Sequence, residues 1–146
     1  MVEMKIFFAH SIIDYGTDKE LSWLVYLNKC YPNAEIINSR DISDTINGED
    51  RKYGLKYMEE KYFFPIIDNC DMVIATSSWN MKRFTIGVVI EMKYAITKNK
   101  KVKIIENDQI MEMGNIEKYE NIVAFCVPGE EPVRMKELIE SKGFIF

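Results

Sequence analysis

Glu91 is the residue of this chain whose type and position are best suited to chemistry. The residues before it, 72–75, form a short apolar run typical of a buried strand, and the stretch from about Gly87 reads as the start of a helix. A carboxylate just beyond the carboxyl end of a parallel strand is well placed to attack or protonate a bound sugar. The apolar residues 86, 88, 89 and 90 predict a largely buried helix, in which a carboxylate usually needs a partner or a function. We therefore take Glu91 as the candidate catalytic residue, against the alternative of a solvated helix glutamate.

Gly87 supports this interpretation. It lies four residues before Glu91, so the two positions share one face of a helix. A glycine there would let a ligand come close to the backbone, and the nearby helix N-terminus would help to keep the Glu91 carboxylate ionised.

Strand and helix patterns alternate along most of the chain. Strands are expected at residues 5–9, 34–37, 72–75, 101–105 and 122–126. Helices are expected from Thr17 or Asp18 to Pro32, from 49 to 69 with an interruption near Pro65, from 86 to 97, and from 131 to 142. The polar stretch 38–50, which contains Asn47-Gly48, is predicted to be a surface loop.

This alternation favours an α/β fold with a mostly parallel sheet covered by helices on both faces. In such sheets ligands bind beyond the carboxyl ends of the strands, where the strand order reverses. The segments expected at those ends are Ala9-His10-Ser11, Asn38-Ser39-Arg40, which Asp41 follows, and Thr76-Ser77-Ser78-Trp79. These residues are the candidate binding residues on the strand ends.

The composition excludes several classes of protein. A chain of 146 residues with 47% apolar residues is expected to form one globular domain, residues 1–146. The net charge of −4 gives no support for nucleic-acid binding, which usually needs a basic face, and no apolar run approaches the ~20 residues that span a membrane. The three scattered cysteines and an N-terminus that leads straight into a strand predict a cytoplasmic protein without a signal peptide.

Several common chemistries have no matching motif. The chain contains neither of the usual glycine-rich phosphate loops. One histidine and three scattered cysteines do not form a recognisable zinc site. The sequence therefore implies no metal and no organic cofactor.

Three segments together resemble the nucleoside 2-deoxyribosyltransferase family. They are Lys5-Ile-Phe-Phe-Ala9, Cys70-Asp-Met-Val-Ile-Ala75 and Gly87-Val-Val-Ile-Glu91-Met-Lys-Tyr-Ala95, and the likeness covers roughly residues 4–106. The resemblance implies a flavodoxin-like three-layer fold with a five-stranded, mostly parallel sheet. It also implies cleavage of an N-glycosidic bond, with Glu91 as the nucleophile that forms a glycosyl-enzyme, followed by transfer of the sugar to water or to a second base.

The chain departs from the family pattern at some positions. Thr85 stands where an aspartate often binds sugar or base, Phe7 and Phe8 occupy the strand that often carries a tyrosine, and Lys93 replaces a frequent glycine. A hydrolase that acts on a nucleotide, or a binding relative without activity, is therefore also compatible with the sequence.

A second resemblance is to TIR domains. It rests on Ile6-Phe-Phe-Ala-His-Ser11, Asp14, and the stretch from Asp71 to Trp79 that leads to Glu91. Some TIR domains cleave NAD with a glutamate on the corresponding helix. The alternatives are therefore a TIR-like NAD-cleaving enzyme and a non-catalytic nucleotide-binding or interaction module.

The predicted ligand is a small nucleoside or nucleotide. Ser11 and Gly87 would line the sugar, His10 or Arg83 would meet a phosphate, and Trp79 would stack on a base or anchor its loop. The full set of predicted binding residues is Phe7, Ala9, His10, Ser11, Arg40, Asp41, Trp79, Arg83, Thr85 and Gly87.

The chain is also predicted to form a homo-oligomer, most simply a dimer. The apolar residues Phe144, Ile145 and Phe146 follow a charged helix, and the resembled family is oligomeric. Either this tail or the surface of residues 62–64 would form the interface.

Overall fold

The computed structural model describes residues 4–79, 82–123 and 131–146. Its five strands are β1 (Met4–Ala9), β2 (Ala34–Asn38), β3 (Met72–Thr76), β4 (Lys101–Glu106) and β5 (Gln109–Glu112). They form one sheet in the order β2-β1-β3-β4-β5, in which the first four strands are parallel and β5 is antiparallel to β4. This is the flavodoxin-like strand order, so the predicted α/β class with a five-stranded, mostly parallel sheet is confirmed.

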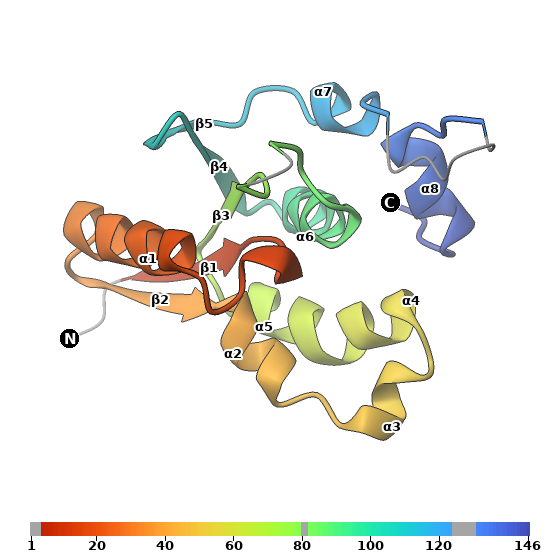
Figure 1. Ribbon diagram of the computed structural model, residues 1–146, viewed down its shortest axis with the longest axis horizontal. Coiled ribbons are helices and arrows are strands. Elements are labelled where there is room, and N and C mark those ends of the chain that lie inside the picture. Colours follow the sequence, from red (N-terminus) through yellow and green to blue (C-terminus); the bar gives the residue numbers. More distant parts are fainter. Residues whose placement is uncertain (1–3, 80–81, 124–130) are drawn as a thin grey trace.

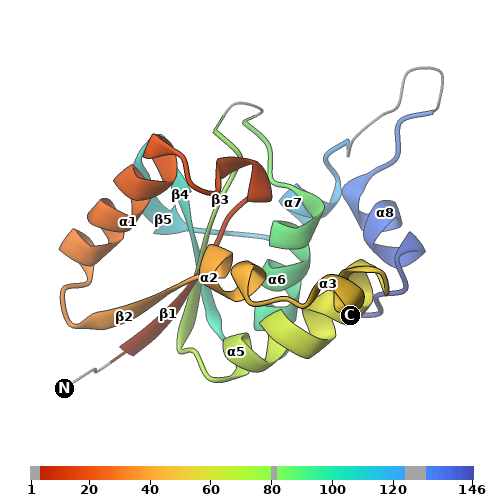
Figure 2. The same cartoon turned by 60° about the horizontal axis from the view of Figure 1, so that its bottom comes forward.

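Helices lie on both faces of this sheet (Figures 1 and 2). The α-helices are α1 (Asp18–Cys30), α2 (Ser39–Asp44), α3 (Gly48–Arg51), α4 (Leu55–Met58), α5 (Phe64–Asp68), α6 (Ile86–Thr97), α7 (Glu117–Glu120) and α8 (Met135–Ser141). A 3₁₀ helix covers Ile12–Asp14 and a π-helical segment covers Glu59–Phe63. In Figure 2, α1 lies on one side of the sheet and α5 and α6 lie on the other.

The alternation of side chains along β1 divides the core in two. Ile6 and Phe8 point to the α1 side, where they pack with Trp23 and Leu27. Phe7 and the residues in phase with it point to the α6 side, into the larger cluster. Successive side chains of a strand face opposite ways, so an apolar run such as this is buried on both faces.

Helix α1 begins where the sequence predicts. The Thr17 hydroxyl accepts a hydrogen bond from the Glu20 backbone N–H at 3.2 Å, which caps the helix N-terminus. Helix α6 also has its expected bounds, and Gly143 ends α8 with a φ of +92°, the left-handed conformation that suits a glycine after a helix.

The prediction of a surface loop at residues 38–50 is wrong. This segment contains α2 and α3, and the side chains of Asn38 and Asn47 cap them by accepting hydrogen bonds from Arg40 N–H and Glu49 N–H. Polar residues that favour loops also favour helix N-caps, so composition did not separate the two cases.

The single helix predicted for residues 49–69 is divided into several pieces. Gly54, with a φ of +91°, interrupts it, which the sequence analysis did not predict. The interruption predicted near Pro65 is present as the π-helical turn, in which the Phe64 N–H donates to the Glu59 carbonyl. Pro65 then lies in the first turn of α5, directly after this π turn.

The fifth strand differs from its predicted position. It is β5, which pairs with β4 through a tight turn at Asn107 and Asp108, both with positive φ. Of the expected strand at 122–126, Val123 forms an isolated bridge with Arg134, and residues 124–126 lie outside the described residues. Helix α8 starts at Met135, later than the predicted residue 131.

The apolar tail is partly internal. Phe144 is buried and packs edge-to-face on Phe64, and Phe63 and Phe64 are themselves core residues. Ile145 and Phe146 remain exposed. Among the described residues, no helix is both long enough and apolar enough to cross a membrane.

Candidate active site

Glu91 lies in the second turn of α6 and is almost completely buried, with 4% of its surface exposed. The helix is apolar around it, and Val88, Val89, Ile90 and Met92 are all core residues. Thr85 occupies the N-cap position of α6, but its side chain makes no capping hydrogen bond. The hydroxyl of Thr85 therefore stays available at the entrance to the helix.

A second carboxyl group, that of Glu59, faces Glu91. Glu59 opens the π-helical turn and is 2% exposed. Its Oε2 atom has no hydrogen-bond partner among the described residues. A Cβ added at Gly87 would lie 3.7 Å from Glu59 Oε1, which is an ordinary van der Waals contact. A side chain at position 87 would therefore not clash with Glu59, but its absence leaves space beside the carboxyl group.

The two carboxyl groups change each other's protonation. Burial raises the pKa of Glu91 to about 7, and a hydrogen bond from Glu59 acts in the opposite direction. Burial, and then the charge of Glu91, hold the pKa of Glu59 well above its ordinary value. Near neutral pH the pair therefore keeps one proton, with Glu59 as the acid that donates to the Glu91 carboxylate.

This pair lies at a cavity of about 270 Å³. The walls are mostly apolar and come from residues Ile12, Ile13, Ile46, Leu55, Met58, Phe63, Ile86 and Val88. Polar side chains enter the wall from Ser11, Tyr15, Ser43, Arg51 and Thr85. An apolar cavity with a few converging polar groups and carboxyls of perturbed pKa has the character of a small-molecule site.

The cavity lies where the fold favours ligand binding. His10 and Ser11 follow the carboxyl end of β1, and β1 lies between β2 and β3 in the sheet. In this strand order the connections leave β1 and β3 in opposite directions, which opens a crevice at their carboxyl ends.

His10 is held by its own hydrogen bonds beneath the cavity. Its Nε2 lies 2.7 Å from Glu20 Oε2, and its Nδ1 lies 3.2 Å from Ser39 Oγ. Burial lowers the pKa of His10 despite the neighbouring carboxylate, so the ring is neutral near pH 7. With Nε2–H donating to Glu20, Nδ1 accepts from Ser39, and Ser39 accepts from the Tyr15 hydroxyl at 3.2 Å.

Glu20 closes this network. Burial alone would raise its pKa, but hydrogen bonds from His10, Gly16 and Arg40 outweigh burial and lower it. Arg40 Nη1 donates to Glu20 Oε1 at 3.0 Å. The network fixes the loop after β1 and thereby fixes Tyr15 at the cavity wall.

The structure brings together only part of the predicted set. His10, Ser11, Thr85, Gly87 and Glu91 line the cavity. Phe7 and Ala9 are buried in β1 on the same side of the sheet.

The other predicted residues lie elsewhere. Arg40 and Asp41 line a separate hollow beside α1, and Trp79 lines a third one. Arg83 is exposed, and its carbonyl accepts a hydrogen bond from Ser78 N–H. Arg83 does not line the cavity of Glu91.

Glu59, Tyr15 and Arg51 are cavity residues that sequence reasoning missed. For Glu59 a signal existed, because Leu55, Glu59 and Phe63 are spaced four apart and so share a helix face with two apolar residues. A glutamate at the centre of such a face is predicted to be buried.

Comparison with known proteins adds no assignment. The chain matches no protein-family model, and no curated protein is significantly similar to it. The function must therefore be argued from the geometry of the site.

The carboxyl pair predicts a pH dependence of stability. Because the pKa of Glu91 is about 7 in the folded chain against an ordinary 4.5, its stabilising contribution is complete below about pH 4.5 and is lost as the pH rises through about 7. The double variant Glu59→Gln/Glu91→Gln has no carboxyl group at either position, so its stability does not depend on the titration of this pair. Its free energy of unfolding, relative to that of the wild type, should rise by at least roughly 2–3 kcal/mol between pH 5 and pH 8 from Glu91 alone, since one pKa unit is worth about 1.4 kcal/mol, and the raised pKa of Glu59 adds to this rise.

Urea unfolding at the two pH values measures this difference. The matched control is Glu60→Gln, which changes an exposed neighbouring glutamate and should show the wild-type dependence. If the double variant and the wild type differ in free energy of unfolding by the same amount at pH 5 and at pH 8, the pair does not titrate between these pH values and the prediction is wrong.

Proposed function

We propose that this protein cleaves or transfers at the N-glycosidic bond of a nucleoside or nucleotide, with Glu91 as the nucleophile. The observation that carries the proposal is the buried pair of carboxyl groups, both with a raised pKa, at a small cavity on the carboxyl edge of the sheet. Glycosidases that retain the configuration of the anomeric carbon use two carboxyl groups, one ionised as the nucleophile and one protonated as the acid. The resemblance to nucleoside 2-deoxyribosyltransferases leads to the same reaction.

In the first step a carboxylate oxygen of Glu91 bonds to the anomeric carbon of the sugar, and the bond from that carbon to the base nitrogen breaks. The electron pair of the broken bond stays with the base, which takes the proton of Glu59. In the second step water or another base attacks the anomeric carbon, the Glu91 ester bond breaks, and the released proton returns to Glu59.

The cavity has a size suited to a small substrate. Ligand sites commonly enclose ~300–1,000 Å³, and this cavity of about 270 Å³ is at the small end. A single nucleoside matches it better than a complete dinucleotide. An NAD-cleaving enzyme is the second candidate, in which only the nicotinamide riboside end would enter the cavity, and a non-catalytic binding module is the third.

The proposal includes a cytoplasmic location. Cys30 is exposed and Cys70 is buried, and both are free thiols. Free thiols are typical of a reducing compartment.

Removal of either carboxyl should greatly slow base release while the fold persists. Glu91→Gln loses the nucleophile, so the rate should fall by several orders of magnitude, and Glu59→Gln should lose roughly 10²–10⁴-fold as expected for a general acid. The assay incubates the protein with deoxynucleosides, nucleoside monophosphates and NAD and detects free base by chromatography. Glu60→Gln is the control and should keep the wild-type rate.

The products distinguish the candidates. Free purine or pyrimidine supports the proposed reaction, and free nicotinamide from NAD supports the second candidate. Release of no base by the wild type from any of these compounds would refute both and favour the binding module.

Arg51 is the phosphate contact expected from the structure, in place of Arg83. Among the described residues that line the cavity it is the only Lys or Arg, and its Nη2 donates to the Ser43 carbonyl at 2.8 Å, which fixes the guanidinium. Arg51→Ala should raise the KM for a nucleoside 5′-monophosphate by roughly 10–100-fold, the scale of a hydrogen bond to a charged group. The KM for the free nucleoside should change much less.

Arg83→Ala provides the matched control, because it removes an exposed arginine outside the cavity. It should leave both KM values unchanged. A larger effect from Arg83→Ala than from Arg51→Ala would contradict the assignment.

The proposed assembly is a homo-oligomer formed through residues 145 and 146. Ile145 is 98% exposed and Phe146 is 42% exposed, and burial of such side chains is favourable by roughly 1.5–3 kcal/mol each when complete. Light scattering should give the mass of a dimer or a larger oligomer, and deletion of residues 145–146 should shift it toward the monomer. A wild-type monomer at micromolar concentration would refute the assembly.

A further inference from the structure

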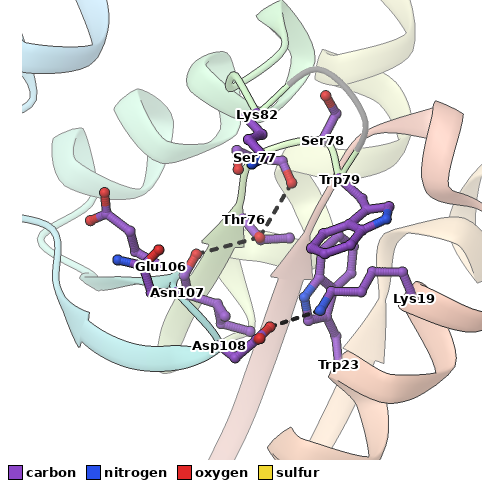
Figure 3. A pocket seen from close by; sticks show the side chains of 11 residues that line it. Lys19, Trp23, Thr76, Ser77, Ser78, Trp79, Lys82, Glu106, Asn107 and Asp108 are labelled. Atoms are coloured by element: carbon purple, nitrogen blue, oxygen red, sulfur yellow. Dashed lines mark hydrogen bonds and ion pairs between the residues drawn. The ribbon is translucent and has the colours of Figure 1, made fainter.

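The hollow lined by Trp79, of about 340 Å³, lies on the other side of the loop that follows β1. It is formed at the carboxyl ends of β3 and β4 and by the start of α1, and Figure 3 shows its side chains. Its lining residues are Lys19, Trp23, Thr76, Ser77, Ser78, Trp79, Lys82, Ile105, Glu106, Asn107 and Asp108. None of them lines the cavity of Glu91.

We propose that this hollow is a second, non-catalytic binding site for a mononucleotide. The base would stack on Trp79, and the phosphate would lie against the ammonium groups of Lys19 and Lys82. The inference does not depend on the proposed reaction at Glu91.

Trp79 is an aromatic platform held in place at an exposed position. Its side chain is on the wall of the hollow and the residue is 51% exposed, although large aromatic groups are usually covered. Its backbone N–H donates to the buried carboxylate of Asp14 at 3.2 Å. This bond holds the backbone at Trp79, and an exposed indole suits stacking on a nucleobase.

Lys19 supplies a positive charge beside this indole. Its Nζ lies 4.2 Å from the centre of the Trp79 ring and 2.7 Å from Asp108 Oδ1. The Lys19 side chain is only 18% exposed, whereas the Asp108 side chain is 73% exposed. A phosphate could therefore replace the exposed Asp108 partner while Lys19 stays in place, and Figure 3 shows Lys19 between the indole and Asp108.

Polar groups at the wall complete the site. Lys82 has a φ of +52°, a strained conformation for a lysine, and such strain concentrates at functional positions. Glu106 can accept hydrogen bonds from ribose hydroxyls.

The fluorescence of tryptophan reports on this site directly. The chain has two tryptophans, and both Trp23 and Trp79 line this hollow. The experiment titrates adenosine 5′-monophosphate, adenosine and inorganic phosphate into the full-length Glu91→Gln variant, so that turnover does not interfere. The monophosphate should quench the fluorescence saturably, and adenosine should bind about tenfold or more weakly because it lacks the charged contact.

Variants identify the groups that bind. Lys19→Met and Trp79→Ala should each weaken binding of the monophosphate about tenfold or more, measured by calorimetry. Asp108→Asn should strengthen it about two- to fivefold, since it frees Lys19 from an exposed ion pair. The matched control is Lys29→Met, which removes an exposed lysine of the same helix and should have no effect.

Several results would overturn the proposal. They are no saturable quenching at millimolar monophosphate, equal effects of Lys19→Met and Lys29→Met, and equal affinity for adenosine and its monophosphate. Loss of binding in Arg51→Ala with normal binding in Lys19→Met would place the ligand in the Glu91 cavity and would also overturn it. Base release by the wild type is measured separately, so failure here leaves the catalytic proposal standing.

Discussion

The removal of two carboxyl groups from water is the constraint on which this structure depends. Glu59 and Glu91 are each less than 5% exposed, and a buried carboxylate without a partner is strongly unfavourable. Burial raises the pKa of both groups, which favours retention of a proton by the pair and so reduces the negative charge in the cavity. Burial of the pair therefore lowers the free energy of unfolding, as is common at active sites. The packing of the surrounding core must offset this loss.

The surrounding elements hold the pair in this geometry. Glu91 is carried by α6, which packs on the sheet through Val88 and Val89 and so has a fixed position. Glu59 is carried by a π-helical turn that is joined directly to α5. The wider turn accommodates Pro65 and sets the direction of Glu59, and π turns within helices are often found at functional sites.

A chain of hydrogen bonds that ends at the Glu20 carboxylate holds the loop between the Glu91 cavity and the hollow of Trp79. It runs from Tyr15 through Ser39 and His10 to Glu20. On one side of this loop lie the carboxyl pair and its apolar cavity, and on the other side Asp14 holds Trp79. The same short segment therefore positions groups on both faces of the sheet edge.

The sequence by itself determined the strands β1 to β4, helices α1 and α6, and the parallel order of the fold, because these follow from local apolar patterns and caps. It also determined the burial of Glu91, since the apolar residues around it leave no polar face on α6. It did not predict α2, because Asn38 fits a loop as well as a helix cap, or the edge strand β5, which depends on pairing with β4.

Only the tertiary structure decided which side chains meet. Glu59 lies 32 positions before Glu91 in the sequence, and their contact depends on the break at Gly54 and on the π turn, which no short pattern specifies. The tertiary structure likewise decided that Arg40 pairs with the Glu20 carboxylate. It also decided that Arg83 remains exposed to solvent. Local patterns fix periodicity and burial, whereas the partners of a polar side chain are set by the packing of distant segments against one another.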